Sequence, residues 1–194
     1  DANGGTLVSG KAKQTVEHGK TATAPVYEKV GYTLSWDKVF DNITEETTVT
    51  AVWTIKTYNV VFDANGGTLV RGKANQTVEH GKAATAPVYE KEGYTLSWEK
   101  TFNNITEDTI VTAVWTIKTY DVVFDGSGGV YVSGEVTQTI EYGKSAIAPV
   151  FRTPGLTLTW DRSFENIKSN TNVKANWVAK VEFIANGGSS VESS

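Results

Sequence analysis

The only histidines are His18 and His80, and an imidazole could act as a general base or as a metal ligand. Either role needs partner groups that converge on the histidine. The adjacent Glu17 and Glu79 are next in sequence, so on a strand they point to the opposite face. We therefore interpret both histidines as exposed or edge-strand residues, and we predict no catalytic residue, no cofactor and no enzyme.

The loop at residues 63–67, Asp-Ala-Asn-Gly-Gly, offers oxygen ligands for calcium through Asp63 and Asn65. A loop of the EF-hand type also requires further acidic ligands and a bidentate glutamate at its end, and these are missing. Asn and Gly tolerate a positive φ, so a tight turn explains the loop better. We predict no metal site.

Six tryptophans in 194 residues could stack on sugars, because flat rings pack on sugar faces. All six recur at positions typical of a core, however, so core packing is the better interpretation. Three other aromatic side chains are the weak candidates for ligand binding. Tyr27, Tyr89 and Phe151 each follow Pro-Val and precede a charged residue, which predicts greater exposure.

The bulk composition excludes several functions. A net charge of -4 without clustered Lys or Arg argues against nucleic-acid binding. No apolar run approaches the roughly 20 residues that cross a bilayer, so we expect no membrane insertion. The chain has no Cys, which excludes disulfides and thiolate metal sites. Abundant Thr, Val, Trp and Tyr favour strands.

The elements that must position these residues are repeated. Asp1, Asp63 and Asp125 open three copies spaced 62 residues apart. Copies one and two differ at 10 of 62 positions, and copies two and three match at 25 of 53. A fourth copy begins near Val181. This period is too long for a solenoid unit and is typical of small tandem domains.

One copy contains four predicted strands, at residues 58–62, 76–81, 93–98 and 109–115, and a short extended piece at 68–70. Residues 82–87 could form one helical turn or stay extended before the proline. Alternation of apolar residues gives the predicted core. Its members in copy two are Val61, Val78, Tyr94, Leu96, Trp98, Phe102, Ile105, Val111, Ala113 and Trp115.

Four ordered motifs of copy two resemble the Listeria–Bacteroides repeat, a family that includes the B-repeats of internalins. They are Val60–Gly67 (VVFDANGG), Gln76–Pro87 (QTVEHGKAATAP), Gly93–Trp98 (GYTLSW) and Asn104–Trp115 (NITEDTIVTAVW). The resemblance covers essentially the whole chain. It departs from the family pattern at Ser97, where Gly is frequent, and at Leu156, where Tyr is usual.

This resemblance implies mainly β, β-grasp-like modules with small mixed sheets and at most a short helix. It also implies tandem modules in secreted or wall-attached surface proteins of Gram-positive bacteria, in a virulence-associated family. The family has no shared catalytic residues to transfer.

The predicted modules are residues 1–55, which lack the first family strand, 56–117 and 118–178, followed by a truncated fourth repeat at 179–194. Two arrangements are open for the strand at 58–62. It either opens copy two or closes copy one, and we favour the first. If copy one is incomplete, Val181–Ile184 of a neighbouring chain could supply its missing strand. Short linkers without Gly or Pro predict an elongated, semi-rigid rod.

Two functions fit this sequence. The first is a non-catalytic stalk or spacer segment of an extracellular cell-surface or cell-wall protein, which projects a distal functional domain. The alternative is an adhesion module that binds a host glycan or protein through repeated patches, with avidity from repetition. The second predicts an exposed apolar or aromatic patch at the same place on each copy.

Overall fold

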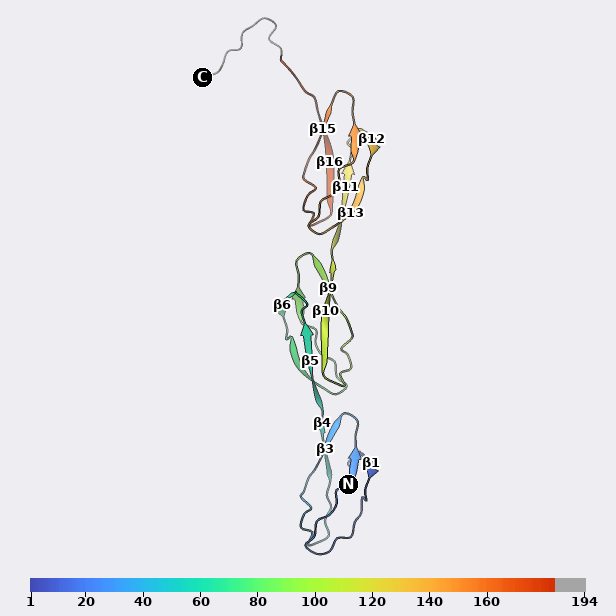
Figure 1. Cartoon of the computed structure of the whole chain (residues 1–194), viewed down its shortest axis with the longest axis vertical. Coiled ribbons are helices and arrows are strands. Elements are labelled where there is room, and N and C mark those ends of the chain that lie inside the picture. The colour runs from blue at the N-terminus through green and yellow to red at the C-terminus, as the bar shows by residue number, and fades with distance from the viewer. Residues whose placement is uncertain (184–194) are drawn as a thin grey trace, which may run out of the picture. The chain divides into compact units, whose positions relative to one another are not determined.

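The computed structural model describes residues 1–183, and every regular element in that part of the chain is a β-strand (Figure 1). From here on, copies one, two and three denote the predicted modules 1–55, 56–117 and 118–178. Copy one contains β1 (Thr6–Ser9), β2 (Val26–Glu28), β3 (Tyr32–Trp36) and β4 (Ala51–Ile55). Copy two contains β5 (Thr57–Asp63), β6 (Thr68–Arg71), β7 (Asn75–Glu79), β8 (Val88–Glu90), β9 (Tyr94–Trp98) and β10 (Thr109–Ile117). Copy three contains β11 (Thr119–Asp125), β12 (Val130–Ser133), β13 (Thr137–Glu141), β14 (Val150–Arg152), β15 (Thr157–Trp160) and β16 (Thr171–Val178).

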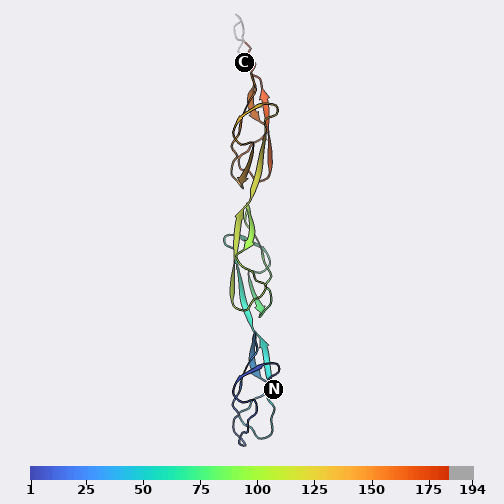
Figure 2. The same cartoon turned by 90° about the vertical axis from the view of Figure 1, so that its right-hand side faces the viewer.

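Copies two and three each have one mixed four-stranded sheet and one two-stranded ribbon. The sheets have the orders β7-β5-β10-β9 and β13-β11-β16-β15. In copy three the central strand β11 is antiparallel to β13 and parallel to β16. Figures 1 and 2 show this part of the chain from two sides. The fold class predicted from the sequence is confirmed, with tandem β modules and no helix in residues 1–183.

Residues 82–87 form no helical turn, so the extended alternative is the correct one. The short strand β8 (Val88–Glu90) was not predicted. It has only three residues, and its pairing with β6 comes from the tertiary fold. Isolated segments of that length carry no periodicity that could identify them.

The core of each complete copy lies under its central strand. Val60 and Phe62 of β5 are 0% and 2% exposed, whereas Val61 between them is 36% exposed. Our placement of Val61 in the core is therefore wrong. The run Val60-Val61-Phe62 has apolar residues in both phases of the strand, so alternation alone cannot choose the buried face. Ile105, Val111 and Ala113 are buried as predicted.

The aromatic residues of the predicted core surround this buried centre. Trp98 packs edge-on against Phe62, with ring centroids 5.0 Å apart, and Phe102 also contacts Phe62 at 5.2 Å. Copy three repeats the arrangement with Phe124 and Trp160 at 5.1 Å. Edge-to-face aromatic pairs contribute about 0.5–1.5 kcal/mol beyond their buried area. The tryptophans therefore belong to the packing of each copy, although their rings are only half-buried.

The strand at 57–63 pairs with the strands that follow it. Val60 lies opposite Gln76 of β7 and opposite Thr109 of β10, and Val122 of copy three is paired in the same way. By contrast, residues 47–50 of copy one have no strand beside them within residues 1–183, and β4 begins only at Ala51. In copy two the equivalent residues belong to the nine-residue β10.

By contact density, the chain divides into two compact units. The first contains Asp1–Lys91 and Leu96–Val114, and the second contains Glu92–Thr95 and the chain from Trp115 onward. The module bounds predicted from the repeat period stay predictions. Of the segment expected to begin a fourth copy, Val181 and Phe183 are described and exposed, and Ile184 lies outside the described residues.

Within residues 1–183 there is no helix that could span a membrane.

Candidate functional site

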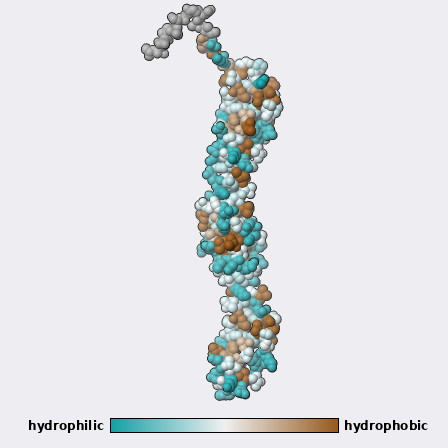
Figure 3. All heavy atoms as spheres, viewed as in Figure 1, coloured by the Kyte–Doolittle hydropathy of each residue, from teal (hydrophilic) through white to brown (hydrophobic). Residues whose placement is uncertain are grey.

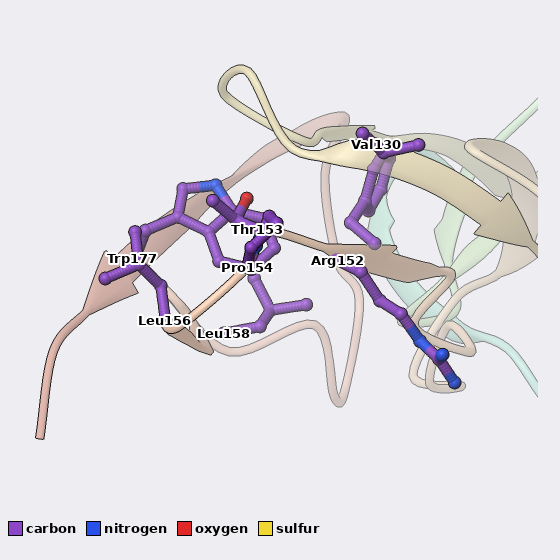
Figure 4. A pocket seen from close by; sticks show the side chains of 8 residues that line it. Val130, Arg152, Thr153, Pro154, Leu156, Leu158 and Trp177 are labelled. Atoms are coloured by element: carbon purple, nitrogen blue, oxygen red, sulfur yellow. The ribbon is translucent and has the colours of Figure 1, made fainter.

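An open pocket of about 440 Å³ lies at the end of copy three where β15 begins and β16 ends. Its walls are mainly apolar, and Figure 4 shows Pro154, Leu158 and Trp177 gathered on one side. The Arg152 side chain points away from them in the same view. The lining residues are Val130, Phe151, Arg152, Thr153, Pro154, Leu156, Leu158 and Trp177.

Two residues that line this pocket differ from their equivalents in copy one. In copy one, Lys29 Nζ lies 4.6 Å from the centre of the Tyr32 ring. Copy three has Thr153 and Leu156 at those two positions, which are smaller and cannot form a cation–π contact. The Thr153 hydroxyl is buried and has no hydrogen-bond partner among residues 1–183.

The pocket walls are suited to an apolar group. The indole N–H of Trp177 already donates to the carbonyl of Gly126 at 3.0 Å. The other polar side chains of the lining are Thr153 and Arg152, and the latter points away in Figure 4. The described residues also contain no cluster of three His, Asp or Glu side chains placed to hold a metal ion.

The three aromatic residues chosen as ligand candidates have different positions. The expected exposure of Tyr89 is wrong, because it is 5% exposed and its hydroxyl donates to the carbonyl of Phe62 at 2.8 Å. Burial, and then the charge of Asp63, raise the pKa of Tyr89. Tyr27 is half-buried against Trp36 at 6.0 Å.

Phe151 is the candidate that the structure brings to a cavity. It is half-buried, it lines the pocket of copy three, and it packs edge-on against Tyr131 at 5.9 Å. Its copy-two equivalent, Tyr89, is anchored by the hydroxyl that Phe151 lacks. Ligand binding by Tyr27, Tyr89 and Phe151 stays a prediction.

His80 lies at the joint between copies one and two, where its ring stacks directly on the backbone of Gly31. A side chain at Gly31 would collide with this ring, and the φ of +77° at Gly31 also favours glycine. The ring is tilted against Tyr58 at 6.0 Å, and its Nδ1 atom is buried with no partner in the described chain. His18 is exposed.

A single residue connects the backbones of copies one and two. The N–H of Lys56 donates to Gly31 O at 2.8 Å, which continues the β3–β4 ladder of copy one. The carbonyl of Lys56 accepts from His80 N at 2.8 Å, which continues the β5–β7 ladder of copy two. There is therefore no linker between β4, which ends at Ile55, and β5, which begins at Thr57.

The second joint repeats this geometry with different side chains. Lys118 donates to Gly93 O and accepts from Tyr142 N, both at 2.8 Å, and the Tyr142 ring covers Gly93 as His80 covers Gly31. In addition, Glu92 accepts hydrogen bonds from the Tyr142 hydroxyl and from Lys168 Nζ, the latter at 3.1 Å.

These contacts shift the pKa values of Glu92 and Lys168 at the second joint. The hydrogen bond from Tyr142, then the hydrogen bond and charge of Lys168, lower the pKa of Glu92. The pKa of Lys168 is raised, first by its interaction with the Tyr142 hydroxyl and then by Glu92. At the first joint, Val30 of copy one occupies the position of Glu92, and Thr106 of copy two occupies the position of Lys168. The first joint therefore lacks this ion pair.

The Asp63 loop is organised as a turn. Asn65 and Gly66 have φ values of +45° and +83°. Asp63 Oδ1 accepts from Asn65 N at 2.9 Å, and the Asn65 amide donates to Ala113 O at 2.9 Å. The oxygens considered for calcium thus serve to shape the loop and fasten it to β10.

Sequence reasoning missed the joints. We placed Gly93 at the start of a predicted strand and Lys118 in a linker, because no local pattern shows that one residue forms hydrogen bonds with two copies. One signal was available. His80 and Tyr142 are large rings at equivalent positions 62 residues apart, each on a residue that follows a strand.

Comparisons with known proteins agree with the repeated architecture. Residues 58–114 match the sequence model of the Listeria–Bacteroides repeat domain. No solved structure matches the chain significantly.

Two relatives come from Evansella cellulosilytica. The first is named only as a Gly-rich membrane protein, and it is 33% identical over 175 residues, which cover 76% of this chain and 20% of the relative. The second is named only as a membrane protein, and it is 31% identical over 175 residues, which cover 78% of this chain and 26% of the relative. The chain therefore spans about a fifth to a quarter of the length of these relatives.

Proposed function

Because residues 58–114 are a Listeria–Bacteroides repeat domain, we propose that the chain is a non-catalytic spacer segment of a bacterial cell-surface protein. In this proposal it is extracellular, belongs to a protein attached to the membrane or cell wall, and projects a distal functional domain. The names of the two relatives support an association with the membrane.

The observation that carries this proposal is the construction of the joints. At Lys56 and at Lys118, the N–H bonds to the copy before and the carbonyl bonds to the copy after. Bending such a joint would separate backbone hydrogen bonds that each contribute about 0.5–1.5 kcal/mol, and would also uncover Gly31 or Gly93. A flexible Gly/Ser linker has no comparable restraint. Direct joints suit a part whose task is to hold a distance.

The test compares the chain with a variant that carries a short Gly-Ser insertion after Lys56 and after Lys118. Small-angle X-ray scattering and the distance distribution between spin labels in copies one and three measure the restraint. We expect a narrow distribution for the native chain and a broad one for the insertion variant. Equally broad distributions would contradict the spacer function.

A matched control places the same insertion after Gly10, in an exposed loop within copy one. This variant carries one insertion of the same kind and leaves both joints unchanged, so its distance distribution should stay narrow.

Adhesion is the second candidate, because every copy exposes apolar side chains at the same place. Val8, Val70 and Val132 are 55%, 55% and 47% exposed at equivalent positions. Repeated patches of this kind are what an adhesin with avidity requires. The test is binding of the chain to arrayed glycans and to host-cell surfaces, with a Val8→Asp/Val70→Asp/Val132→Asp variant. Equal signals from both chains would eliminate these patches as the binding surface.

A further inference from the structure

We propose that the two-stranded ribbons of this chain are surfaces on which a second copy of the same chain docks. The ribbons are β1–β2, β6–β8 and β12–β14. This inference does not depend on the spacer function, since a spacer could act alone or in pairs.

Each ribbon has an outward face that the alternation of its strands defines. In copy two, Tyr89 turns inward, so Val88 and Glu90 on either side of it turn outward. Arg71 lies opposite Val88 in the register, and therefore shares that face. Val70 occupies the bulge between Leu69 and Arg71 and is 55% exposed. The same bulge is present in the ribbons of copies one and three.

The apolar residues of these outward faces are all valines. They are Val8 and Val26 in copy one, Val70 and Val88 in copy two, and Val130, Val132 and Val150 in copy three. Their exposed fractions range from 36% at Val88 to 68% at Val130. Figure 3 shows brown atoms at the levels where Figure 1 places β1 and β12.

Folding of a single copy does not require valine at these positions. Copy three differs from copy two at more than half of the compared positions, as 25 of 53 match, yet Val132 and Val150 are kept and Val130 replaces Thr68. A solvated strand face would accept polar residues without loss of core packing. Exposed valines that persist through this divergence indicate a surface that is covered in use.

The charges on the faces indicate what covers them. The face of copy two has Arg71 at one end and Glu90 at the other, with the valines between them. A second chain related to the first by a two-fold axis would place Arg71 of each chain against Glu90 of the other. Such a patch is complementary to itself, as an isologous interface must be.

The other two faces are complementary to each other. Copy one has Glu28 at the position of Glu90, and Ser9 at the position of Arg71. Copy three has Arg152 and Ser133 at those positions. Copy one is therefore acidic and copy three basic on this face. The copy-one face of one chain is therefore complementary in charge to the copy-three face of another chain, and this favours a second chain over an outside ligand.

One ribbon alone is too small for stable binding. Stable interfaces bury about 1,000 Å² or more in total, whereas each face offers only two or three valines. Three ribbons on one chain act together, because the second and third contacts form within an already associated pair. We therefore expect weak pairing in dilute solution, and stronger pairing where chains are crowded on a surface.

Sedimentation equilibrium of the intact chain over a wide concentration range tests this inference. We expect a monomer–dimer equilibrium that is weakened roughly tenfold or more by Arg71→Glu or by Glu90→Arg alone. The double variant restores both pairs in reversed order, and it should recover most of the native affinity. Such a rescue requires that residue 71 of one chain contacts residue 90 of the other chain.

The control is Val39→Asp, an exposed valine outside the ribbons that is 83% exposed. It should associate like the native chain, while Val70→Asp should not, and circular dichroism verifies that each variant is folded. A native chain that stays monomeric at its highest soluble concentration would overturn the inference, as would single charge reversals without effect. Binding of a glycan or host protein to the Val70 face of a monomeric chain would instead assign that face to the adhesion function.

Discussion

At the scale of single residues, Glu92 adds a side-chain contact to the second joint. Its carboxylate lies between the Tyr142 hydroxyl and the Lys168 ammonium, which also lies 5.2 Å from the centre of the Tyr142 ring. Glu92 and Lys168 are exposed and Tyr142 is half-buried, so salt should screen the ion pair between Glu92 and Lys168. The contact therefore tunes a joint that the backbone bonds of Lys118 already hold.

Acid should release this contact. Because the folded pKa of Glu92 is lowered, its contribution to stability is present above the ordinary glutamate pKa of about 4.3 and is lost as the pH falls through the lowered value. NMR titration of the Tyr142 ring should therefore show a transition below the usual glutamate range. Glu92→Gln should remove that transition.

The raised pKa of Lys168 acts at the other end of the pH scale. Its contribution is present below the ordinary lysine pKa of about 10.4 and is lost as the pH rises through the folded value. Together the two groups predict that the contact is complete over the neutral range. A Tyr142 signal that is unchanged through the acid titration of the native chain would show that the carboxylate does not bind the hydroxyl in solution.

At the scale of elements, each joint places one ring on one glycine. Gly31 and Gly93 are buried under His80 and Tyr142, and both have a positive φ. Gly155 has the equivalent position and a φ of +72° in copy three, but no described atom lies within 4 Å of where its Cβ would be. All three glycines therefore need a positive φ, but only Gly31 and Gly93 also need space for a ring.

Substitution by alanine should distinguish these two effects. Gly155→Ala should cost about 1–2 kcal/mol in unfolding free energy, because only the left-handed backbone is strained. Gly31→Ala and Gly93→Ala should add about 1–3 kcal/mol for the collision with the ring. Urea unfolding followed by Trp fluorescence measures the difference. Equal costs at all three sites would mean that the rings do not pack on the glycines.

At the scale of the whole molecule, the copies differ in how completely their sheets are paired. Residues 109–112 of β10 lie parallel to β5, whereas the equivalent residues 47–50 of copy one have no neighbouring strand in the described chain. Val111 is consequently fully buried, and its equivalent Val49 is only half-buried. The backbone nitrogen of Asp1 donates to Val49 O at 2.7 Å.

This difference predicts a gradient of local stability. Amide hydrogen exchange should be faster at residues 47–49 than at residues 109–111, because the former lack the ladder that protects the latter. Mass spectrometry of peptic peptides, or NMR where the copies resolve, measures the contrast. The equivalent residues of copy three, 171–173, provide the internal control and should exchange as slowly as those of copy two, since β16 pairs with β11 in the same way. Equal protection at all three sites would show that copy one is completed by another strand in solution.

The repeat period, the β class and most of the strands were predictable from sequence, because they depend on local patterns. Alternation identified β9 and most of β10, and Asn-Gly identified the turn at Asn65. Recurrence at 62 residues assigned the tryptophans to packing rather than to a sugar site. These features arise from neighbours along the chain, so one sequence contains the information.

The buried face of β5, the burial of Tyr89 and both joints were decided only by tertiary structure. Val60 and Val61 are chemically identical, and which one is buried depends on the strands on either side of β5. Tyr89 is buried because its hydroxyl reaches Phe62 O, 27 residues away in sequence. Lys56 forms backbone hydrogen bonds with both Gly31 and His80, because the β3–β4 ladder and the β5–β7 ladder both continue to this residue. Contacts between residues so far apart follow from register, which no local pattern specifies.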